Sequence, residues 1–239
     1  MSAIMFYDVE TTGLSPEKNA LIEVAFQPVI NGEKHSTKVF KIRPHEGAII
    51  DDGALKVNGY TLDQIMSWPE GRTVIKEMIE YLDSFEKKFK QGGHNVKFDR
   101  GFLKSFFTRN MEYASFFSIF RSNYKCTYEM SKELKVGSKS NKLKDLCEYF
   151  DIPLVGSHQA ENDIIATVLL YEKLEAMKMK IEPSVSDKSY KQKRAEFLDS
   201  KYIMFNPDGD VYINRSAFNN KEAMRFIIGE LWDLYCEED

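Results

Sequence analysis

The hydrophobic pattern of the chain begins with a short apolar run and continues with two longer stretches of strand character. Residues 3–7 have the length and aromatic content of a buried strand. Residues 21–30 and 34–43 are predicted as two further strands, because Asn31-Gly32 between them is a strong hairpin signal. The first three strands are therefore expected to form an antiparallel meander.

Helical periodicity dominates the middle of the chain. Apolar residues recur at helical spacing from Arg72 to Phe89, and Gly92-Gly93 is expected to end that helix. A second helix is expected to follow the segment His94–Asp99, with Phe102 and Phe106 on its buried side. The other predicted elements are short helical pieces within 51–67, a strand near 124–127, and helices at 128–134, 142–150 and 159–178.

The pattern weakens after residue 178, which predicts a division of the chain. Residues 1–178 are expected to form one domain, and residues 179–195, rich in Lys and Ser, a linker. Residues 196–239 are expected to form a small C-terminal extension, with a hairpin at Asn206-Pro207-Asp208-Gly209 and a helix at 221–235. This extension is too small to be predicted as an independent domain.

Composition excludes several classes of protein. The net charge of −4 does not suit a polycation that coats duplex DNA, so a nucleic-acid substrate would have to be held locally. No window approaches the length of a transmembrane helix, and the N-terminus does not resemble a signal peptide. The three widely spaced cysteines form no C-x-x-C pair, which argues against disulfides or a zinc site. A cytoplasmic location is expected.

Candidate chemistry begins at the end of the first strand. Strand side chains alternate between faces, so Asp8 and Glu10 are expected to point the same way. Two neighbouring carboxylates at the end of a buried strand repel each other and are costly to desolvate. A hard divalent cation such as Mg²⁺ would offset that repulsion. The alternative is a strand that reaches solvent and ends in a polar turn at Thr12-Gly13.

Three more polar residues occupy suggestive places. Asp99 is expected in the first turn of a helix, where it would also complement the helix dipole. Asp163 lies near the start of another helix, close to its apolar stripe. His158 precedes that helix, where it could equally be an exposed loop residue. Each position has an ordinary structural explanation by itself, whereas their combination favours a functional site.

Three motifs together resemble the DEDDh family of 3′→5′ exonucleases. Asp8-Val9-Glu10-Thr11-Thr12-Gly13 is similar to D-x-E-T-T-G, His94–Asp99 to H-N-x-x-F-D, and His158–Asp163 to H-x-A-x-x-D. The segment Lys56–Thr61 resembles a weaker I-H-G-I-T signature, with Asn58 in place of its His. The family includes epsilon-type proofreading subunits of DNA polymerases and free-standing DNA and RNA 3′-end nucleases. The resemblance covers about residues 1–175.

The resemblance implies a ribonuclease-H-like α/β fold, with a mixed five-stranded sheet and helices on both faces. It also implies that Asp8, Glu10, Asp99 and Asp163 hold two Mg²⁺ ions, for which Mn²⁺ can substitute. His158 would take the proton from the attacking water, and a mobile loop position would suit that role. The positions similar to family contacts with the terminal nucleotide are Thr11, Thr12, Gly13, Leu14, Asn95 and Phe98. Leu14 and Phe98 also have ordinary explanations, as a loop hydrophobe and a core residue.

The leading functional prediction is a 3′→5′ exonuclease that releases nucleoside 5′-monophosphates from single-stranded or frayed DNA ends. One alternative keeps this chemistry and acts on RNA, since no residue clearly recognises a 2′-hydroxyl. Another is a non-catalytic module that binds nucleic-acid ends or a polymerase. The C-terminal extension would either dock on the nuclease core or contact a partner, such as a polymerase or a second copy of the chain.

Overall fold

The computed structural model describes residues 2–154, 160–181, 203–205 and 211–213. Contacts divide the chain into two units, Met1–Lys178 and Met179–Asp239, and each is described by itself. Within the described residues, no helix combines the length and apolar content needed to cross a membrane.

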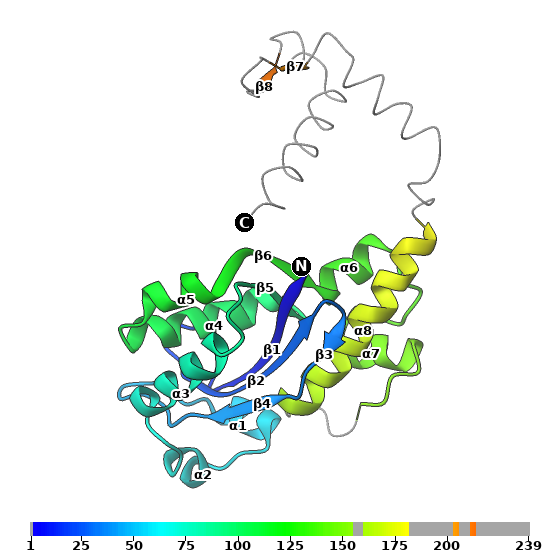
Figure 1. Ribbon diagram of the computed structural model, residues 1–239. Helices are drawn as coiled ribbons and strands as arrows, with labels where there is room; N and C mark the ends of the chain where they lie inside the picture. The colour runs from blue at the N-terminus through cyan, green and yellow to red at the C-terminus, as the bar shows by residue number, and fades with distance from the viewer. Residues whose placement is uncertain (1, 155–159, 182–202, 206–210, 214–239) are drawn as a thin grey trace. The chain divides into compact units, whose positions relative to one another are not determined.

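A mixed sheet forms the centre of the first unit (Figure 1). Its described strands follow the order β3-β2-β1-β5-β6, and β4 pairs with the same edge of β2 as β3. The six-stranded sheet is therefore five strands wide. The strands are β1 (Ala3–Thr11), β2 (Leu21–Ile30), β3 (Glu33–Lys34), β4 (Lys38–Lys41), β5 (Phe89–Gly93) and β6 (Phe120–Cys126).

The predicted antiparallel meander is confirmed, with one correction. Strand β1 pairs antiparallel with β2, and Asn31-Gly32 form a two-residue turn in which both φ angles are positive. The predicted strand at 34–43 is wrong as one element, because it is split into β3 and β4. This split explains why the sheet has six strands rather than the expected five.

Strand β5 was not expected, because residues 72–89 were predicted as one helix. The helix ends at Asp83, and Phe89–Gly93 pairs parallel with β1, with Phe6 opposite Gly92. A Cβ at Gly92 would lie only 2.6–2.9 Å from side-chain atoms of Phe6 and Ile4. The glycine that resembles a helix breaker is therefore a position of close approach within a buried strand.

Eight described helices of the first unit surround the sheet. They are α1 (Asp52–Asn58), α2 (Leu62–Met66), α3 (Gly71–Asp83), α4 (Val96–Arg109), α5 (Tyr113–Ile119), α6 (Thr127–Glu133), α7 (Leu143–Tyr149) and α8 (Ala160–Ile181). The helices predicted at 128–134, 142–150 and 159–178 match α6, α7 and α8 within a few residues. Strand β6 begins before the strand predicted near 124–127.

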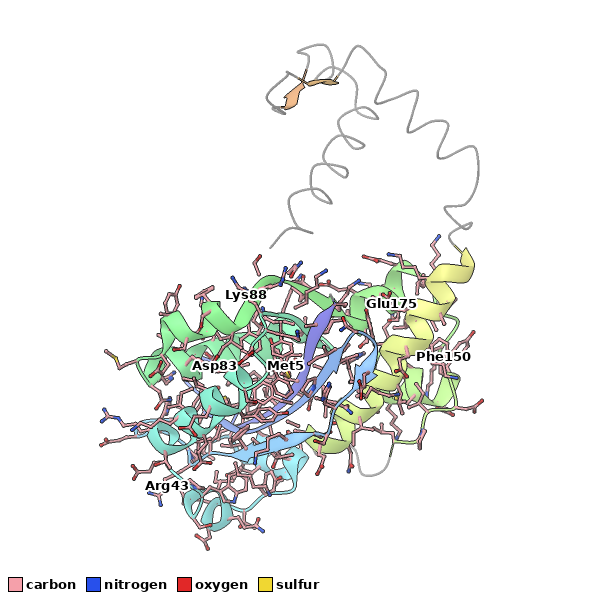
Figure 2. The ribbon with its side chains drawn as sticks, viewed as in Figure 1. Met5, Arg43, Asp83, Lys88, Phe150 and Glu175 are labelled. Atoms are coloured by element: carbon pink, nitrogen blue, oxygen red, sulfur yellow. The ribbon has the colours of Figure 1, made fainter. Side chains whose placement is uncertain are left out.

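Alternate residues of β1 face different helices. Met5, Tyr7 and Val9 pack in the large core cluster that includes residues of α3, α4 and α5. Ile4 and Phe6 pack on the opposite face, against α8. Met5 is labelled within the core in Figure 2. Helices thus cover both faces of the sheet, and the expected ribonuclease-H-like α/β fold is confirmed.

In the second unit the structure describes one small hairpin. Strands β7 (Ile203–Phe205) and β8 (Val211–Ile213) pair antiparallel, where a hairpin was expected. The predicted helix at 221–235 lies outside the described residues. The boundaries of the linker (179–195) and the C-terminal extension (196–239) stay predictions.

The tight packing at Gly92 predicts a large effect of one methyl group. We expect Gly92→Ala to lower the free energy of unfolding by about 1–3 kcal/mol, because Phe6 and Ile4 are buried and must shift. Gly137→Ala is the matched control, since its added Cβ would lie 3.7 Å from Tyr149. Urea unfolding measures both variants. Equal stability of the two variants would contradict this account of β5.

Candidate active site

The alternation of β1 places two acids opposite α8. Ile4, Phe6, Asp8 and Glu10 are the even-numbered residues of this strand and therefore share a face. The first two pack directly on α8, so Asp8 and Glu10 continue the same row toward the carboxyl end of the strand. Glu10 is buried and Asp8 is half-buried.

Asp163 joins these two acids from α8. It lies in the first turn of that helix, whose residues Ala160 and Ile164 are buried against β1 and β2. One carboxylate oxygen from each of Asp8, Glu10 and Asp163 lies within 4.8 Å of the others. Two segments that are about 150 residues apart thus form one acidic cluster.

Asp99 approaches the cluster from α4, the helix that follows the neighbouring strand β5. Strand β5 runs parallel to β1, so the chain that leaves β5 and enters α4 lies at the same edge as Asp8. Asp99 lies in the first turn of α4 and is only 4% exposed. Its Oδ1 accepts a hydrogen bond of 3.2 Å from the backbone N–H of Val9. This bond fixes Asp99 beside the strand that carries Asp8 and Glu10.

Burial raises the pKa values of three of these acids, and neighbouring charges raise two of them further. Burial, followed by the nearby charges of Asp99, Glu10, Asp163 and Glu23, raises the pKa of Asp8 well above its usual value. Burial and three of these neighbours raise the pKa of Glu10 to about 8. Burial raises the pKa of Asp99 to about 7, although hydrogen bonds from backbone N–H groups act in the opposite direction. Without a nearby positive charge, the cluster retains protons near neutral pH.

The donor set of the cluster suits a hard divalent cation. Carboxylate oxygens are the ligands preferred by Mg²⁺ and Mn²⁺, and among the described residues this group consists of carboxylates alone. A divalent cation would favour the ionised forms that burial and mutual repulsion disfavour. The residues present therefore fit the metal ions that the family resemblance implies.

Glu23 is a neighbour that the sequence analysis did not identify. It lies directly opposite Glu10 in the β1–β2 pairing and is 3% exposed. The Tyr60 hydroxyl donates a 2.5 Å hydrogen bond to Glu23, and the Lys41 ammonium lies 3.7 Å from the same carboxylate. A charged residue inside the apolar run 21–30 was the available signal. Glu23 already has partners, so it adds negative charge near the cluster rather than an open ligand position.

The segment after Glu10 is held mainly by internal hydrogen bonds. The Thr11 hydroxyl donates to the Gly13 carbonyl (2.6 Å), and the Thr12 hydroxyl donates to the Ile49 carbonyl (2.8 Å). Asn19, which the sequence analysis did not identify, donates from its amide to the carbonyls of Thr12 and Ile49. A Cβ at Gly13 would collide with the Asn19 side chain at 2.3–2.7 Å. The threonine hydroxyls therefore help to shape this loop.

Leu14 projects from that loop into solvent. It is 85% exposed, so its apolar surface is accessible to a ligand. Behind the loop, Asn58 donates a 2.9 Å hydrogen bond to the Thr11 carbonyl. Asn58, which stands in place of the His of the weaker I-H-G-I-T signature, thus holds the backbone of the first motif from the end of α1.

Asn95 and Phe98 lie at the start of α4, beside Asp99. Asn95 is exposed and has a left-handed conformation, with φ of 62°, which Asn tolerates better than most residues. Phe98 is half-buried, and its ring centroid lies 5.0 Å from that of Phe102. One part of Phe98 thus packs in the core while another part remains accessible. The contacts of both residues with a nucleotide stay predictions.

His158 lies outside the described residues, which exclude 155–159. Its predicted role as a base therefore stays a prediction. His94, in the second motif, has a structural environment instead. Its Nδ1 lies 2.9 Å from the Thr127 hydroxyl, and burial lowers its pKa to about 4.

Comparison with known proteins finds relatives among exonucleases and DNA polymerase III proteins. A family model, the RNase_T exonuclease, matches residues 5–171. The PolC-type DNA polymerase III of Halalkalibacterium halodurans is 31% identical over 166 residues, which are 70% of this chain and 11% of that protein. The DNA polymerase III subunit epsilon of Aquifex aeolicus is 28% identical over 171 residues, which cover 70% of this chain and 77% of that subunit. The chain therefore corresponds to a small part of the PolC-type relatives.

A solved structure supports the fold. The crystal structure of E. coli exonuclease I in complex with a dT13 oligonucleotide superposes with a TM-score of 0.65. The match has 19% identity and covers 76% of this chain and 42% of that one. At the level of the family, the expected enzyme class, an exonuclease that hydrolyses phosphodiesters, is confirmed. Because the family model spans more than half of its length and includes all three motifs, this chain belongs to the RNase_T exonuclease family.

Proposed function

We propose that this protein is a metal-dependent 3′→5′ exonuclease that releases nucleoside 5′-monophosphates from single-stranded or frayed DNA ends. The observation that carries the proposal is the convergence of Asp8, Glu10 and Asp163 within 4.8 Å, with Asp99 held beside them. An acidic cluster of this kind would repel the phosphates of a nucleic acid unless cations were bound between them. Cation binding and substrate binding are therefore coupled.

Asp8, Glu10, Asp99 and Asp163 would hold two Mg²⁺ ions, with Mn²⁺ as a substitute. When bound, such ions supply a Lewis acid that promotes formation of hydroxide at neutral pH and stabilises the charge that develops on the phosphate. The protein contributes rigid ligands, because Asp8 and Glu10 belong to the central strand and Asp99 is bonded to its backbone. Rigid placement limits the reorganisation required during the reaction.

His158 is proposed as the general base. It precedes Asp163 by five residues in the third motif, and an imidazole titrates near neutral pH. It would take a proton from the attacking water as the new bond to phosphorus forms and the bond to the 3′-oxygen breaks.

The terminal nucleotide would lie between the Leu14 loop and the start of α4. The exposed Leu14 side chain can contact the last base, and the accessible part of Phe98 can contact it from the α4 side. The backbone from Thr11 to Gly13 would meet the terminal sugar, while the Thr12 hydroxyl retains its bond to Ile49. Exposed Asn95 would supply a polar contact.

DNA is the proposed substrate because two relatives are DNA polymerase III proteins and the structural neighbour binds a dT13 oligonucleotide. The relationship to polymerase proteins also supports association with a polymerase as a proposal. Self-association through residues 196–239 is the alternative for the C-terminal extension. RNA, hydrolysed by the same chemistry, is the alternative substrate.

Removing one acid of the cluster is expected to abolish turnover. We expect Asp8→Asn and Asp163→Asn each to lower the release of monophosphates from 3′ ends at least about 100-fold, since each loses a ligand for cations that stabilise the transition state. EDTA is expected to abolish release in the wild type. Oligonucleotides labelled at the 3′ or the 5′ end, as DNA and as RNA, distinguish the direction and the substrate.

Asp63→Asn is the control, because it removes an exposed carboxylate from α2. Activity that resists EDTA, or that survives in Asp8→Asn and Asp163→Asn as it does in the control, would contradict the proposal. Faster degradation of RNA than of DNA would move the assignment to the alternative substrate.

The crowded acids also predict how stability depends on pH without metal. The folded pKa values of Asp8, Glu10 and Asp99 are raised, so the folded state retains protons that the unfolded state releases. Their contribution to the free energy of unfolding is therefore expected to fall as the pH rises from about 4 to about 8. Urea unfolding in EDTA measures this dependence.

The wild type is compared with Glu10→Gln, because the wild type alone also reports on His94. The lowered pKa of His94 makes the free energy of unfolding rise with pH below about pH 6.5, opposite to the effect of the acids. We expect the difference in stability between Glu10→Gln and the wild type to grow with pH in EDTA and to shrink when Mg²⁺ is added. Glu46→Gln, which removes an exposed carboxylate, should show neither effect. A difference that is constant with pH would contradict the electrostatic account.

A further inference from the structure

The segment from the end of α6 to the start of α7 concentrates positive charge in a chain whose net charge is negative. Residues 132–144 contain five lysines and one acid, Glu133, whereas the whole chain has a net charge of −4. The lysines are Lys132, Lys135, Lys139, Lys142 and Lys144, and all five are exposed. Such a local reversal of charge suits an anionic partner.

Three of these residues, Lys139, Lys142 and Lys144, form what we call the lysine surface. They line a depression of about 570 Å³ together with Ser140, Asp145 and Glu148. Within the described residues, the ion pairs closer than 4 Å involve other lysines, on β3, β4, α4 and β6. The Asp145 carboxylate accepts a hydrogen bond from Ser140. The lysine surface therefore keeps its ammonium groups available.

The lysine surface is tied to the second motif through Asn141. The Asn141 backbone lies close enough to the His94 ring to raise its pKa, against the larger lowering by burial, and the Nδ1 of that ring lies 2.9 Å from the Thr127 hydroxyl. The Asn141 side chain accepts a 2.9 Å hydrogen bond from the Ser131 hydroxyl. Asn141 immediately precedes Lys142, and His94 immediately precedes Asn95. The partly buried His94 thus links Asn141, and with it the neighbouring Lys142, to the segment that carries Asn95.

Local bonds give the segment a defined conformation. The Ser138 hydroxyl donates to the Ser140 carbonyl (2.8 Å), and the Lys142 N–H donates to the Ser140 hydroxyl (3.2 Å). Val136 and Leu143 pack against the cluster formed by α7 and α8. Because the backbone is already ordered, binding there requires the ordering of lysine side chains alone.

We propose that Lys139, Lys142 and Lys144 bind backbone phosphates of the substrate strand on the 5′ side of its terminal nucleotide. This inference rests on the proposed function, which places the 3′ end beside Asn95. A single nucleic-acid strand that leaves the acidic cluster needs positive side chains along its path. The protein's net charge of −4 provides no general attraction for the phosphates of that strand. The lysine surface provides them immediately beyond the second motif.

The test compares two triple variants of equal charge. The first is K139A/K142A/K144A. The control is K76A/K87A/K88A, whose lysines lie on α3 and in the connection that enters β5 at the end opposite Asn95. Figure 2 shows Lys88 far from Phe150, the residue that follows α7. Thermal unfolding confirms that both variants are folded.

Binding is measured by fluorescence anisotropy of a labelled single-stranded DNA oligonucleotide in Ca²⁺ over a series of salt concentrations. We expect K139A/K142A/K144A to weaken binding at low salt about tenfold or more. We also expect its plot of log affinity against log salt to be shallower by about 2, since each phosphate contact contributes about 0.7 for single strands. The control variant should follow the wild type.

Turnover in Mg²⁺ separates this inference from the proposed function. The p-nitrophenyl ester of thymidine 5′-monophosphate has no upstream strand, so the variant should lose more kcat/KM on a long oligonucleotide than on this ester. Salt slopes equal to those of the control, or an equal loss on both substrates, would overturn the inference. A wild type that binds the oligonucleotide but hydrolyses neither substrate would overturn the proposed function and leave the binding result to decide the inference.

Discussion

The crowding of carboxylates that are wholly or partly removed from solvent is the constraint on which the site depends. Asp8, Glu10 and Asp163 share a space of less than 5 Å, and Asp99 lies beside them. Burial is the main cause of the raised pKa values of Asp8, Glu10 and Asp99, and the neighbouring acids raise those of Asp8 and Glu10 further. A fold retains such an arrangement only where the rest of the structure is stable enough to hold it. Bound divalent cations would convert this unfavourable cluster into a strong binding site.

The packing of β1 and the geometry of the site follow from the same alternation. The row that buries Ile4 and Phe6 against α8 brings Asp8 and Glu10 toward Asp163. A shift of the strand by one residue would move the apolar and acidic residues to the other face together. The core therefore maintains the register that the acids require. The hydrogen bond from the Val9 N–H to the Asp99 carboxylate links the fourth acid, on α4, to the same strand.

Local signals explain which elements could be predicted from the sequence. Strand β2 was predicted within its observed bounds, because a ten-residue apolar run ends at an Asn-Gly turn. Strand β5 was missed, because its short segment Phe89–Gly93 has helical periodicity on one side and two glycines that resemble a breaker. Its strand conformation comes from pairing with β1 and from the close approach of Phe6 to Gly92, and neither is visible locally.

The site residues also divide into those with a local sequence signal and those fixed by long-range contacts. The motifs predict Asp8, Glu10, Asp99 and Asp163 as site residues, because residue type and order carry that information. Glu23 and Asn19 were missed, because their roles depend on pairing across β1 and β2 and on the shape of the Thr12–Asn19 loop. Long-range register of this kind is not encoded in any short window of sequence.

Direct measurement of Mn²⁺ binding tests the central claim, that acids from three distant segments together hold divalent cations. Electron paramagnetic resonance of free Mn²⁺ during titration of the protein gives the number and affinity of bound ions. The account predicts two bound ions per chain in the wild type and weaker or fewer bound ions in Asp163→Asn, with an unchanged result for Asp63→Asn. Wild-type protein that binds no Mn²⁺, or an Asp163→Asn variant that binds it as the wild type does, would contradict the account.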